Sequence, residues 1–311
     1  MTKFMATRDA YGEALKELGK TNKDIVVLDA DLSGSTKTAV FKKEYPDRFF
    51  NVGIAEQNLM GTAAGLATTG KIPFASTFAM FATGRAFEII RNSICYPKLN
   101  VKIAATHAGL TVGEDGATHQ SVEDLSLMRS IPNMTVLCPA DGVEAKKAII
   151  KASQYNGPVY IRLGRSKEPV IFNQDYNFQI GKGVELKAGN NITIIATGIM
   201  VSKALEAGKI LENHGISARV INISTIKPID EDIIIKAAKE TKKIVTVEEH
   251  SIIGGLGSAV AEVLVENYPV PLKRIGVEDK FGESGTAEDV LKKYGLTVEN
   301  IVEKVKKIIS N

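Results

Sequence analysis

The chain has 311 residues, of which 44% are hydrophobic and 24% charged, and 39 basic against 36 acidic side chains give a net charge of +3. The charges are spread evenly, which excludes a basic stripe for nucleic acid and a polybasic cluster for a membrane surface. No apolar run approaches the roughly 20 residues that cross a bilayer. The amino-terminal sequence MTKFMATRDAYGEALKEL lacks the apolar core of a signal peptide and predicts an amphipathic helix. Two separated cysteines, Cys95 and Cys138, exclude a disulfide framework and suit a cytoplasmic protein.

The first half of the chain alternates short apolar runs with helical patterns. The runs are four to seven residues long and rich in β-branched residues, as strands buried on both faces are. They predict strands over residues 24–30, 71–76, 101–106, 134–140 and 158–163. Helices are predicted over residues 56–69, 80–95, 122–129 and 141–154. Ser121 and Asp124 form a capping-box pattern at the start of the third helix. This alternation is typical of a parallel sheet.

The pattern breaks after the fifth strand, where the sequence becomes polar and rich in turn residues. A second alternating set follows, with strands near 191–197, 218–224, 243–249 and 272–278 and helices near 200–213, 230–241, 256–267 and 298–309. We therefore expect a first domain over residues 1–166, a linker over 167–190 and a smaller second domain over 191–311. The fold class predicted is α/β, with two doubly wound domains and mainly parallel sheets.

The glycine-rich segment GGLGSAVAE (254–262) invites a dinucleotide-binding interpretation. The motif GxGxxG anchored at Gly255 needs a glycine or alanine at position 260, where the chain has Val260. We therefore interpret these glycines as a tight turn at a helix N-terminus.

Three segments concentrate polar residues where strands of the first domain end. DADLSGST (29–36) follows the first strand and suits either a polar ligand or an ordinary turn with capping hydroxyls. In NVGIAEQNLMG, Glu56 begins a helix that carries Gly61 and Gly65, which we expect to pack closely against a neighbour. Glu56 is either a helix-end acid or a buried hydrogen-bond partner for a ligand nitrogen.

The third segment, HAGLTVGEDGATHQS (107–121), is the richest in chemical groups. It places His107, Glu114, Asp115 and His119 among three glycines, which is typical of an active site. A metal site is the competing functional interpretation, although the spacing fits no standard metal motif. A structural glycine turn is the remaining alternative.

Arginine and phenylalanine side chains complete the set of candidates. Arg8 begins the first helix, and Arg162 and Arg165 end the fifth strand, so the three could bind a phosphorylated substrate. Phe78 and Phe81 are spaced i, i+3 and could belong to the core or form an apolar wall for a flat heterocycle.

Taken together, NVGIAEQNLMG, PFASTFAMFATGRAFEIIRNSI, HAGLTVGEDGATHQSVEDL and YIRLGR resemble the pyrimidine-binding domain of transketolases. The following 120 or so residues resemble the transketolase C-terminal domain. The resemblance covers essentially the whole chain in order, and the GEDGxTHQ loop with two histidines 12 residues apart is its most specific part. It implies transfer of a two-carbon ketol unit from a ketose phosphate to an aldose phosphate, through a carbanion of thiamine diphosphate.

The resemblance also implies roles for individual residues. Glu56 matches the glutamate that bonds N1′ of the cofactor's aminopyrimidine and promotes deprotonation of the thiazolium C2. Phe78 and Phe81 match its aromatic pocket, and Asp31 matches an acid near the cofactor. His119 matches a histidine that transfers protons near the donor carbonyl. The remaining matches bind the sugar phosphate: a hydroxyl is bound by Asp115, and the phosphate by His107, Arg8, Ser35 and Arg165.

Two departures from the family pattern bear on function. Gly84 stands where many members have a tyrosine in the aromatic wall. The GDG motif that holds the diphosphate and its magnesium in a preceding domain is absent, and we expect no metal ligands in this chain. The resemblance therefore implies the C-terminal subunit of a split transketolase. A separate N-terminal chain would bind magnesium, and the assembly would hold two copies of each chain.

Three alternatives remain from the sequence. The beta subunit of a 2-oxo acid dehydrogenase has the same two-domain plan, but the GEDGxTHQ loop and the arginines speak against it. Deoxyxylulose phosphate synthase resembles the chain too, but carries an acid at the position of His107 and is usually one long chain. A non-catalytic scaffold partner would be expected to have lost at least one of the four residues Glu56, His107, Asp115 and His119, which are all present.

Overall fold

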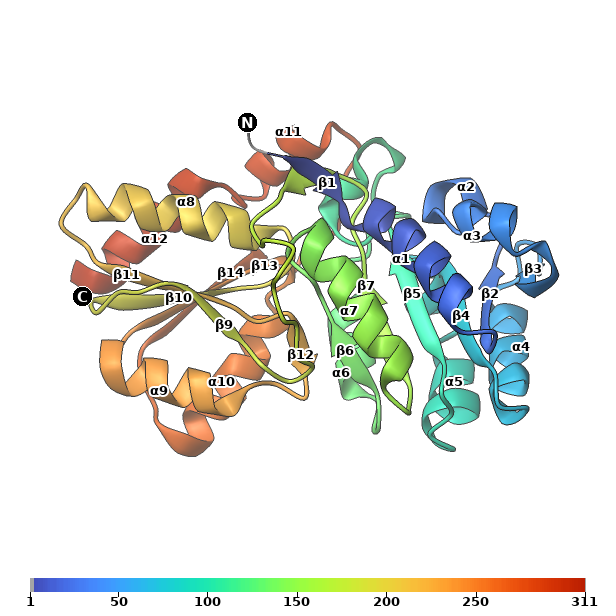
Figure 1. Cartoon of the computed structure of the whole chain (residues 1–311). Helices are drawn as coiled ribbons and strands as arrows, with labels where there is room; N and C mark the ends of the chain where they lie inside the picture. The colour runs from blue at the N-terminus through green and yellow to red at the C-terminus, as the bar shows by residue number, and fades with distance from the viewer. Residues whose placement is uncertain (1–2, 311) are drawn as a thin grey trace.

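A computed structural model describes residues 3–310, which form two α/β domains lying side by side (Figure 1). Each domain has a central sheet with helices on both faces, and the strands that build the two cores are parallel. The predicted fold class is confirmed. No helix within residues 3–310 combines the length and the apolar character needed to cross a membrane.

Among residues 3–166, the first domain contributes to its central sheet the five strands expected from the sequence and one more. They are β2 (Ile25–Asp29), β3 (Phe49–Asn51), β4 (Ile72–Phe78), β5 (Lys102–Thr106), β6 (Thr135–Leu137) and β7 (Val159–Arg162). The helices are α1 (Thr7–Thr21), α2 (Ser33–Thr36), α3 (Ala39–Glu44), α4 (Glu56–Thr68), α5 (Phe87–Ile89), α6 (Asp124–Ser130) and α7 (Gly142–Gln154). The pairs β2–β4, β4–β5 and β5–β7 are all parallel, so their carboxyl ends meet at one edge of the sheet.

Local structure differs from the sequence expectations in three places. The amino-terminal helix begins only at Thr7, because a short strand β1 (Phe4–Ala6) precedes it. The helix expected over residues 80–95 contains two π-helical turns, Phe81–Arg85 and Ile90–Cys95, on either side of α5. The capping box predicted for α6 is wrong, because Asp124 is buried in contacts with Tyr160 and Arg162.

The second domain contains the four predicted strands and a fifth that was not predicted. Its strands are β9 (Val184–Lys187), β10 (Ile192–Ala196), β11 (Ala218–Asn222), β13 (Ile244–Ser251) and β14 (Leu272–Val277). Its helices are α8 (Met200–Glu212), α9 (Glu231–Thr241), α10 (Leu256–Asn267), α11 (Ala287–Lys293) and α12 (Val298–Ser310). The sheet order is β14-β13-β10-β11-β9. Gly255 lies at the N-cap of α10, as expected for a helix-start turn.

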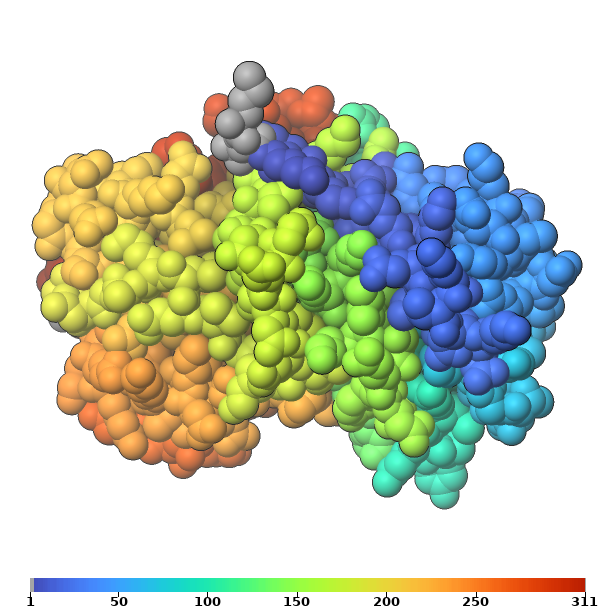
Figure 2. All heavy atoms as spheres, in the orientation of Figure 1, coloured from blue at the N-terminus to red at the C-terminus, as the bar shows by residue number. Residues whose placement is uncertain are grey.

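The segment expected to be a linker is largely built into the two domains. Its β8 (Lys167–Pro169) pairs antiparallel with β1, and β9 pairs antiparallel with β11. Figure 2 shows this yellow-green segment lying along the seam between the domains. A further short strand, β12 (Thr225–Lys227), leaves the second domain and pairs with β6, which makes the first sheet seven-stranded, in the order β12-β6-β7-β5-β4-β2-β3.

The apolar core continues across the junction between the domains. Val136 of β6 belongs to the same buried cluster as Ile195 and Ile221 of the second sheet. On the other side of the junction, Leu110 and Val122 of the first domain pack with the second domain's core. Shared burial of this kind fixes the two domains relative to each other.

Candidate active site

The candidate residues lie at the carboxyl edge of the first sheet. β2, β3 and β5 end there, and each is followed by one of the three polar segments. β4 ends there at Phe78, and β7 ends just before Arg165. In open α/β sheets this edge is where ligands bind, because the loops converge there and helix N-termini face it.

An aromatic stack forms the centre of the site. The ring of Phe78 lies between His107, at 3.9 Å between centroids, and Phe81, at 5.8 Å. His119 approaches Phe81 edge-on, with centroids 5.3 Å apart. Phe78 ends β4 and Phe81 begins a π-helical turn, a local distortion that occurs frequently at functional sites. The aromatic rings therefore join the two histidines of the 107–121 loop.

His107 is held by Arg8 in a defined tautomer. Arg8 Nη1 lies 3.0 Å from His107 Nε2, and a guanidinium can only donate, so Nε2 accepts the hydrogen bond. Nδ1 then carries the proton and donates to Thr106 Oγ1 at 2.9 Å. Arg8 Nη1 also donates to the backbone oxygen of Ser35 at 3.2 Å, which brings three of the predicted phosphate-binding residues together.

The charge state of His107 follows from its surroundings. Burial, reinforced by the charges of Arg8 and Arg165, lowers the pKa of His107 to about 3. The imidazole is therefore neutral in the folded protein near pH 7. It can accept a hydrogen bond from Arg8 and leaves the positive charge of the site on the arginines.

This low pKa predicts a loss of stability in mild acid. As the pH falls below the ordinary histidine value of 6.5, the unfolded chain binds a proton that the folded chain excludes, so the free energy of unfolding decreases. Between about pH 6.5 and about pH 5, His107 should account for up to about 2 kcal/mol of the decrease. Urea unfolding of the wild type and of His107→Gln at both pH values measures this share. An identical pH dependence in the two proteins would contradict the prediction.

The loop after β2 is organised by Asp29. This buried carboxylate accepts hydrogen bonds from the Leu32 backbone N–H at 2.5 Å and from the hydroxyls of Thr36 and Thr38 at 2.7 and 2.9 Å. It thereby fixes the turn that presents Ser35 to Arg8. Asp31 is exposed with a φ of 63° and accepts from Asn51 Nδ2 at 2.8 Å. Within residues 3–310, Asp31 makes no hydrogen bond with Glu56 or with the residues that surround His107.

Glu56 is buried at the first position of α4, as its sequence position predicted. Its Oε2 accepts from Arg85 Nη1 at 2.7 Å, and the Arg85 guanidinium lies 5.1 Å from the centre of the Phe81 ring. In the part of the chain that the structure describes, Oε1 of Glu56 makes no hydrogen bond. Arg85 thus links Glu56 to the aromatic stack, a contact that the sequence did not suggest.

The 107–121 loop folds as a 3₁₀ turn, Leu110–Asp115, between glycines with positive φ. Arg165 lies beside it, 3.5 Å from a carboxylate oxygen of Glu114 and 3.6 Å from one of Asp115. His119 Nδ1 lies 2.9 Å from the hydroxyl of Thr118. Asp115 and Arg165 are therefore adjacent.

One expectation about this region is wrong. Arg162 does not face a ligand, because it is 6% exposed, donates to Asp124 at 2.9 Å and lies 3.7 Å from Glu249. Gly61 and Gly65 of α4, which were expected to pack closely, have no such neighbour within this chain: a Cβ atom at either position would meet no atom of residues 3–310 within 4 Å. Ile54, just before α4, is 79% exposed, so this side of the helix is open.

At Gly84, the departure from the family pattern, space is limited. A Cβ atom there would lie 2.7 Å from the Met80 side chain, so Met80 fills part of the region that a larger residue would need. Gly84 lies within the first π-helical turn.

Two family descriptions match the chain: "Transketolase, pyrimidine binding domain" over residues 3–169 and "Transketolase, C-terminal domain" over residues 181–301. Together with the fold and the aromatic, histidine and arginine site, they define the class. The chain belongs to the transketolase family.

Its relatives include subunits of transketolases encoded in two parts. A putative transketolase C-terminal section of Methanocaldococcus jannaschii is 57% identical, over 97% of this chain and 96% of that protein. A 6-deoxy-6-sulfo-D-fructose transketolase subunit of a Clostridium strain is 45% identical, over 95% of this chain and 92% of that protein. A solved structure is described as "Split gene transketolase, inactive beta4 tetramer". It shares 61% sequence identity with this chain, covers 98% of this chain and 99% of its own, and superposes with a TM-score of 0.93. The likeness to the C-terminal subunit of a split transketolase is thus confirmed.

Human transketolase aligns differently. It is 38% identical over 98% of this chain, which spans only 49% of the human protein.

Within residues 3–310, no group of three or more histidine, cysteine, aspartate or glutamate side chains could hold a metal ion.

Proposed function

We propose that the chain is one subunit of a transketolase that transfers a two-carbon ketol unit from a ketose phosphate to an aldose phosphate. The observation that carries the proposal is the meeting of Glu56, the aromatic stack, both loop histidines and two arginines at one sheet edge. A non-catalytic scaffold protein would not be expected to keep all of these side chains at one site.

The residues around Glu56 fit the aminopyrimidine of thiamine diphosphate. The site offers a buried carboxylate with one oxygen free of hydrogen bonds within residues 3–310, and Arg85 links it to Phe81, which stacks on Phe78. Bound there, the cofactor would supply the nucleophilic carbon that takes up the ketol unit. Glu56 would hold or release a proton at the pyrimidine N1′, and the two phenylalanines would keep water away from it.

The other residues suit a sugar phosphate. Arg8 and Arg165 would bind the phosphate through charge-assisted hydrogen bonds, with neutral His107 orienting Arg8 and Ser35 completing the pocket. Asp115 would accept from a sugar hydroxyl, which requires it to exchange its contact with Arg165 for the substrate. His119, beside Phe81, would move a proton near the donor carbonyl.

A partner chain would complete the site. We propose that it binds the diphosphate and magnesium, and that two copies of each chain assemble. An observation of the structure that supports this is the open face of α4 beside Glu56, at Gly61 and Gly65. The named subunits among the relatives agree with it.

The pairing of Arg85 with Glu56 gives a prediction about cofactor affinity. Oε1 of Glu56 is free for the pyrimidine, but we expect the carboxyl group to turn toward the cofactor as it binds, which weakens its contact with half-exposed Arg85 at a cost of up to about 1 kcal/mol. Arg85→Met should therefore bind magnesium thiamine diphosphate up to about fivefold more tightly in the assembled enzyme. Calorimetric titration measures this, with exposed Arg91→Met as the control. Weaker binding by Arg85→Met would mean that Arg85 itself contacts the cofactor.

Product analysis tests the proposed reaction. The chain and its partner are incubated with xylulose 5-phosphate, ribose 5-phosphate, magnesium and thiamine diphosphate, and products are identified by mass spectrometry. We expect a seven-carbon ketose phosphate and a three-carbon aldose phosphate. A parallel incubation contains pyruvate, and consumption of pyruvate without ketol transfer would support a 2-oxo acid dehydrogenase or deoxyxylulose phosphate synthase activity. Inactivity with every substrate would support the scaffold alternative.

A further inference from the structure

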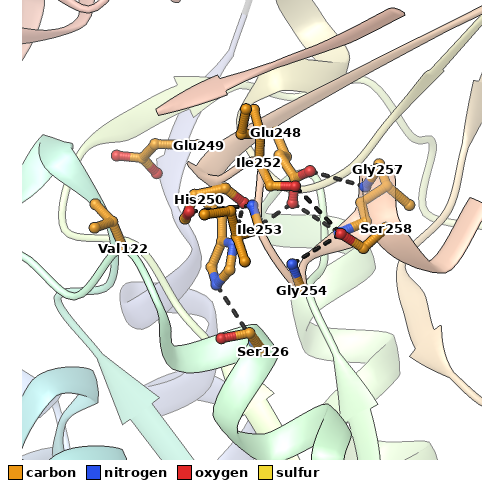
Figure 3. Close-up of polar contacts among 12 residues, drawn as sticks. Val122, Ser126, Glu248, Glu249, His250, Ile252, Ile253, Gly254, Gly257 and Ser258 are labelled. Atoms are coloured by element: carbon orange, nitrogen blue, oxygen red, sulfur yellow. Dashed lines mark hydrogen bonds and ion pairs between the residues drawn. The ribbon is translucent and has the colours of Figure 1, made fainter. Parts of the chain in front are cut away.

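The second domain reaches into the first at the end of β13, where three successive side chains are buried. Glu248, Glu249 and His250 are each at most 3% exposed. Side chains along a strand alternate between its faces, and Figure 3 shows Glu249 turned away from Glu248. The proposed reaction gives none of the three a role.

Glu248 and His250 are accounted for by contacts near their own strand. Glu248 accepts hydrogen bonds from the backbone N–H groups of Leu256 and Gly257 at 2.7 and 2.8 Å (Figure 3). It thereby pairs two N–H groups at the start of α10 that have no partner within the helix. His250 Nδ1 donates to the Ser251 backbone oxygen at 2.7 Å, and its Nε2 accepts from the Ser126 N–H at 3.4 Å. These two side chains hold β13, α10 and α6 together.

Glu249 instead contacts the active-site loop of the first domain. Its Oε1 accepts from the Thr111 backbone N–H at 2.6 Å. A Cβ atom at Gly109 would lie 2.3 Å from the carboxyl carbon of Glu249, so the carboxylate rests directly on the loop backbone. The two contacting residues are 138 positions apart in sequence.

The position of Glu249 is itself fixed. Arg162 Nη2 donates to the Glu249 backbone oxygen at 2.9 Å, and Nη1 lies 3.7 Å from the carboxylate. Arg162 is held in turn by Asp124. The buried arginine therefore orients the carboxylate toward residues 109–111 and compensates its charge.

The loop held in this way carries the reacting side chains. His107, two residues before Gly109, has a φ of 55°, a conformation that its own sequence does not favour. His119 follows Thr111 by eight residues. The loop makes a second hydrogen bond to the second domain: Gln120 Nε2 donates to the backbone oxygen of Glu283 at 2.9 Å. The loop conformation thus depends on contacts from the second domain.

We propose that Glu249 is a positioning residue, through which the second domain fixes the loop that carries His107, Asp115 and His119. The kinetic consequence rests on the proposed ketol transfer, whereas the ordering of the loop does not. Glu249 acts through the backbone of the loop and touches no substrate.

Hydrogen–deuterium exchange of the full chain tests the ordering directly. In Glu249→Ala, amides of residues 107–121 should exchange at least about tenfold faster, because a hydrogen bond to a buried charged group is lost. Glu249→Gln keeps an acceptor oxygen and should stay within about threefold of the wild type. Glu248→Gln removes an equally buried carboxyl from the same strand and should leave the loop unchanged. Unchanged exchange in a folded Glu249→Ala chain, or equal acceleration in Glu248→Gln, would overturn the proposal.

Kinetics of the assembled enzyme test the consequence. Glu249→Ala should raise KM for the ketose phosphate about tenfold while the melting temperature matches that of Glu248→Gln, and Glu249→Gln should restore KM. A loosened loop with unchanged KM and kcat would overturn the positioning role. If the wild type transfers no ketol unit with any partner, the proposed function fails, and the exchange experiment still decides whether Glu249 orders the loop.

Discussion

Glu56→Gln is expected to abolish ketol transfer while leaving the chain folded and able to assemble. The substitution keeps the size of a buried side chain at the start of α4 and removes its ability to hold a proton for the cofactor. Proton transfer by a positioned side chain contributes about 10²- to 10⁴-fold to a rate. We therefore expect kcat to fall by at least about 10²-fold in a coupled assay with the partner chain.

Two controls make this prediction specific. Glu206→Gln changes an exposed glutamate on α8 of the second domain and should keep full activity. The melting temperature and the elution volume of the assembled Glu56→Gln enzyme should match the wild type. If Glu56→Gln retains most of the wild-type kcat, the chain does not act on the cofactor in the proposed way.

Arg8→Met is expected to weaken binding of phosphorylated substrates far more than it slows the reaction. Arg8 is the side chain that links His107 to the Ser35 backbone, and it carries a positive charge into a half-buried site. Loss of a charge-assisted hydrogen bond to phosphate costs about 1.5–3 kcal/mol, which corresponds to a rise in KM of about 10- to 100-fold. Steady-state kinetics with a ketose phosphate measures the rise.

A substrate without phosphate provides the internal control. A ketose that lacks the phosphate should show nearly the same KM with the wild type and with Arg8→Met, because the lost contact is absent in both cases. Lys43→Met removes an exposed positive charge from α3 and should change neither KM. Equal effects of Arg8→Met on both kinds of substrate would show that Arg8 supports the loop structure and does not bind phosphate.

Much of the fold could be predicted because its central strands are short apolar runs buried on both faces. β2, β4, β5 and β10 all have this character. β9 and β12 could not be predicted, because they are only four and three residues long and their pairing partners are distant in sequence, and β9 is also partly exposed. Strand propensity describes a half-buried surface, and such segments acquire it only when the sheet edge is present.

The site residues on the loops could be predicted, but not all of their contacts. Residue type and position at strand ends indicated Glu56, His107 and His119. Arg162 was misjudged because its burial depends on Asp124 and on Glu249 of the second domain. Contacts between residues this far apart in sequence leave no periodic signal in the chain, and Glu249 and Arg85 could not be predicted for the same reason.

In the function proposed for it, this chain supplies one half of a shared active site. The most direct test is a titration of a fixed amount of the chain with its partner, followed by coupled assay with xylulose 5-phosphate, ribose 5-phosphate, magnesium and thiamine diphosphate. We expect no turnover by either chain alone and activity that rises with added partner until the two are equimolar. Turnover by this chain without a partner would contradict it.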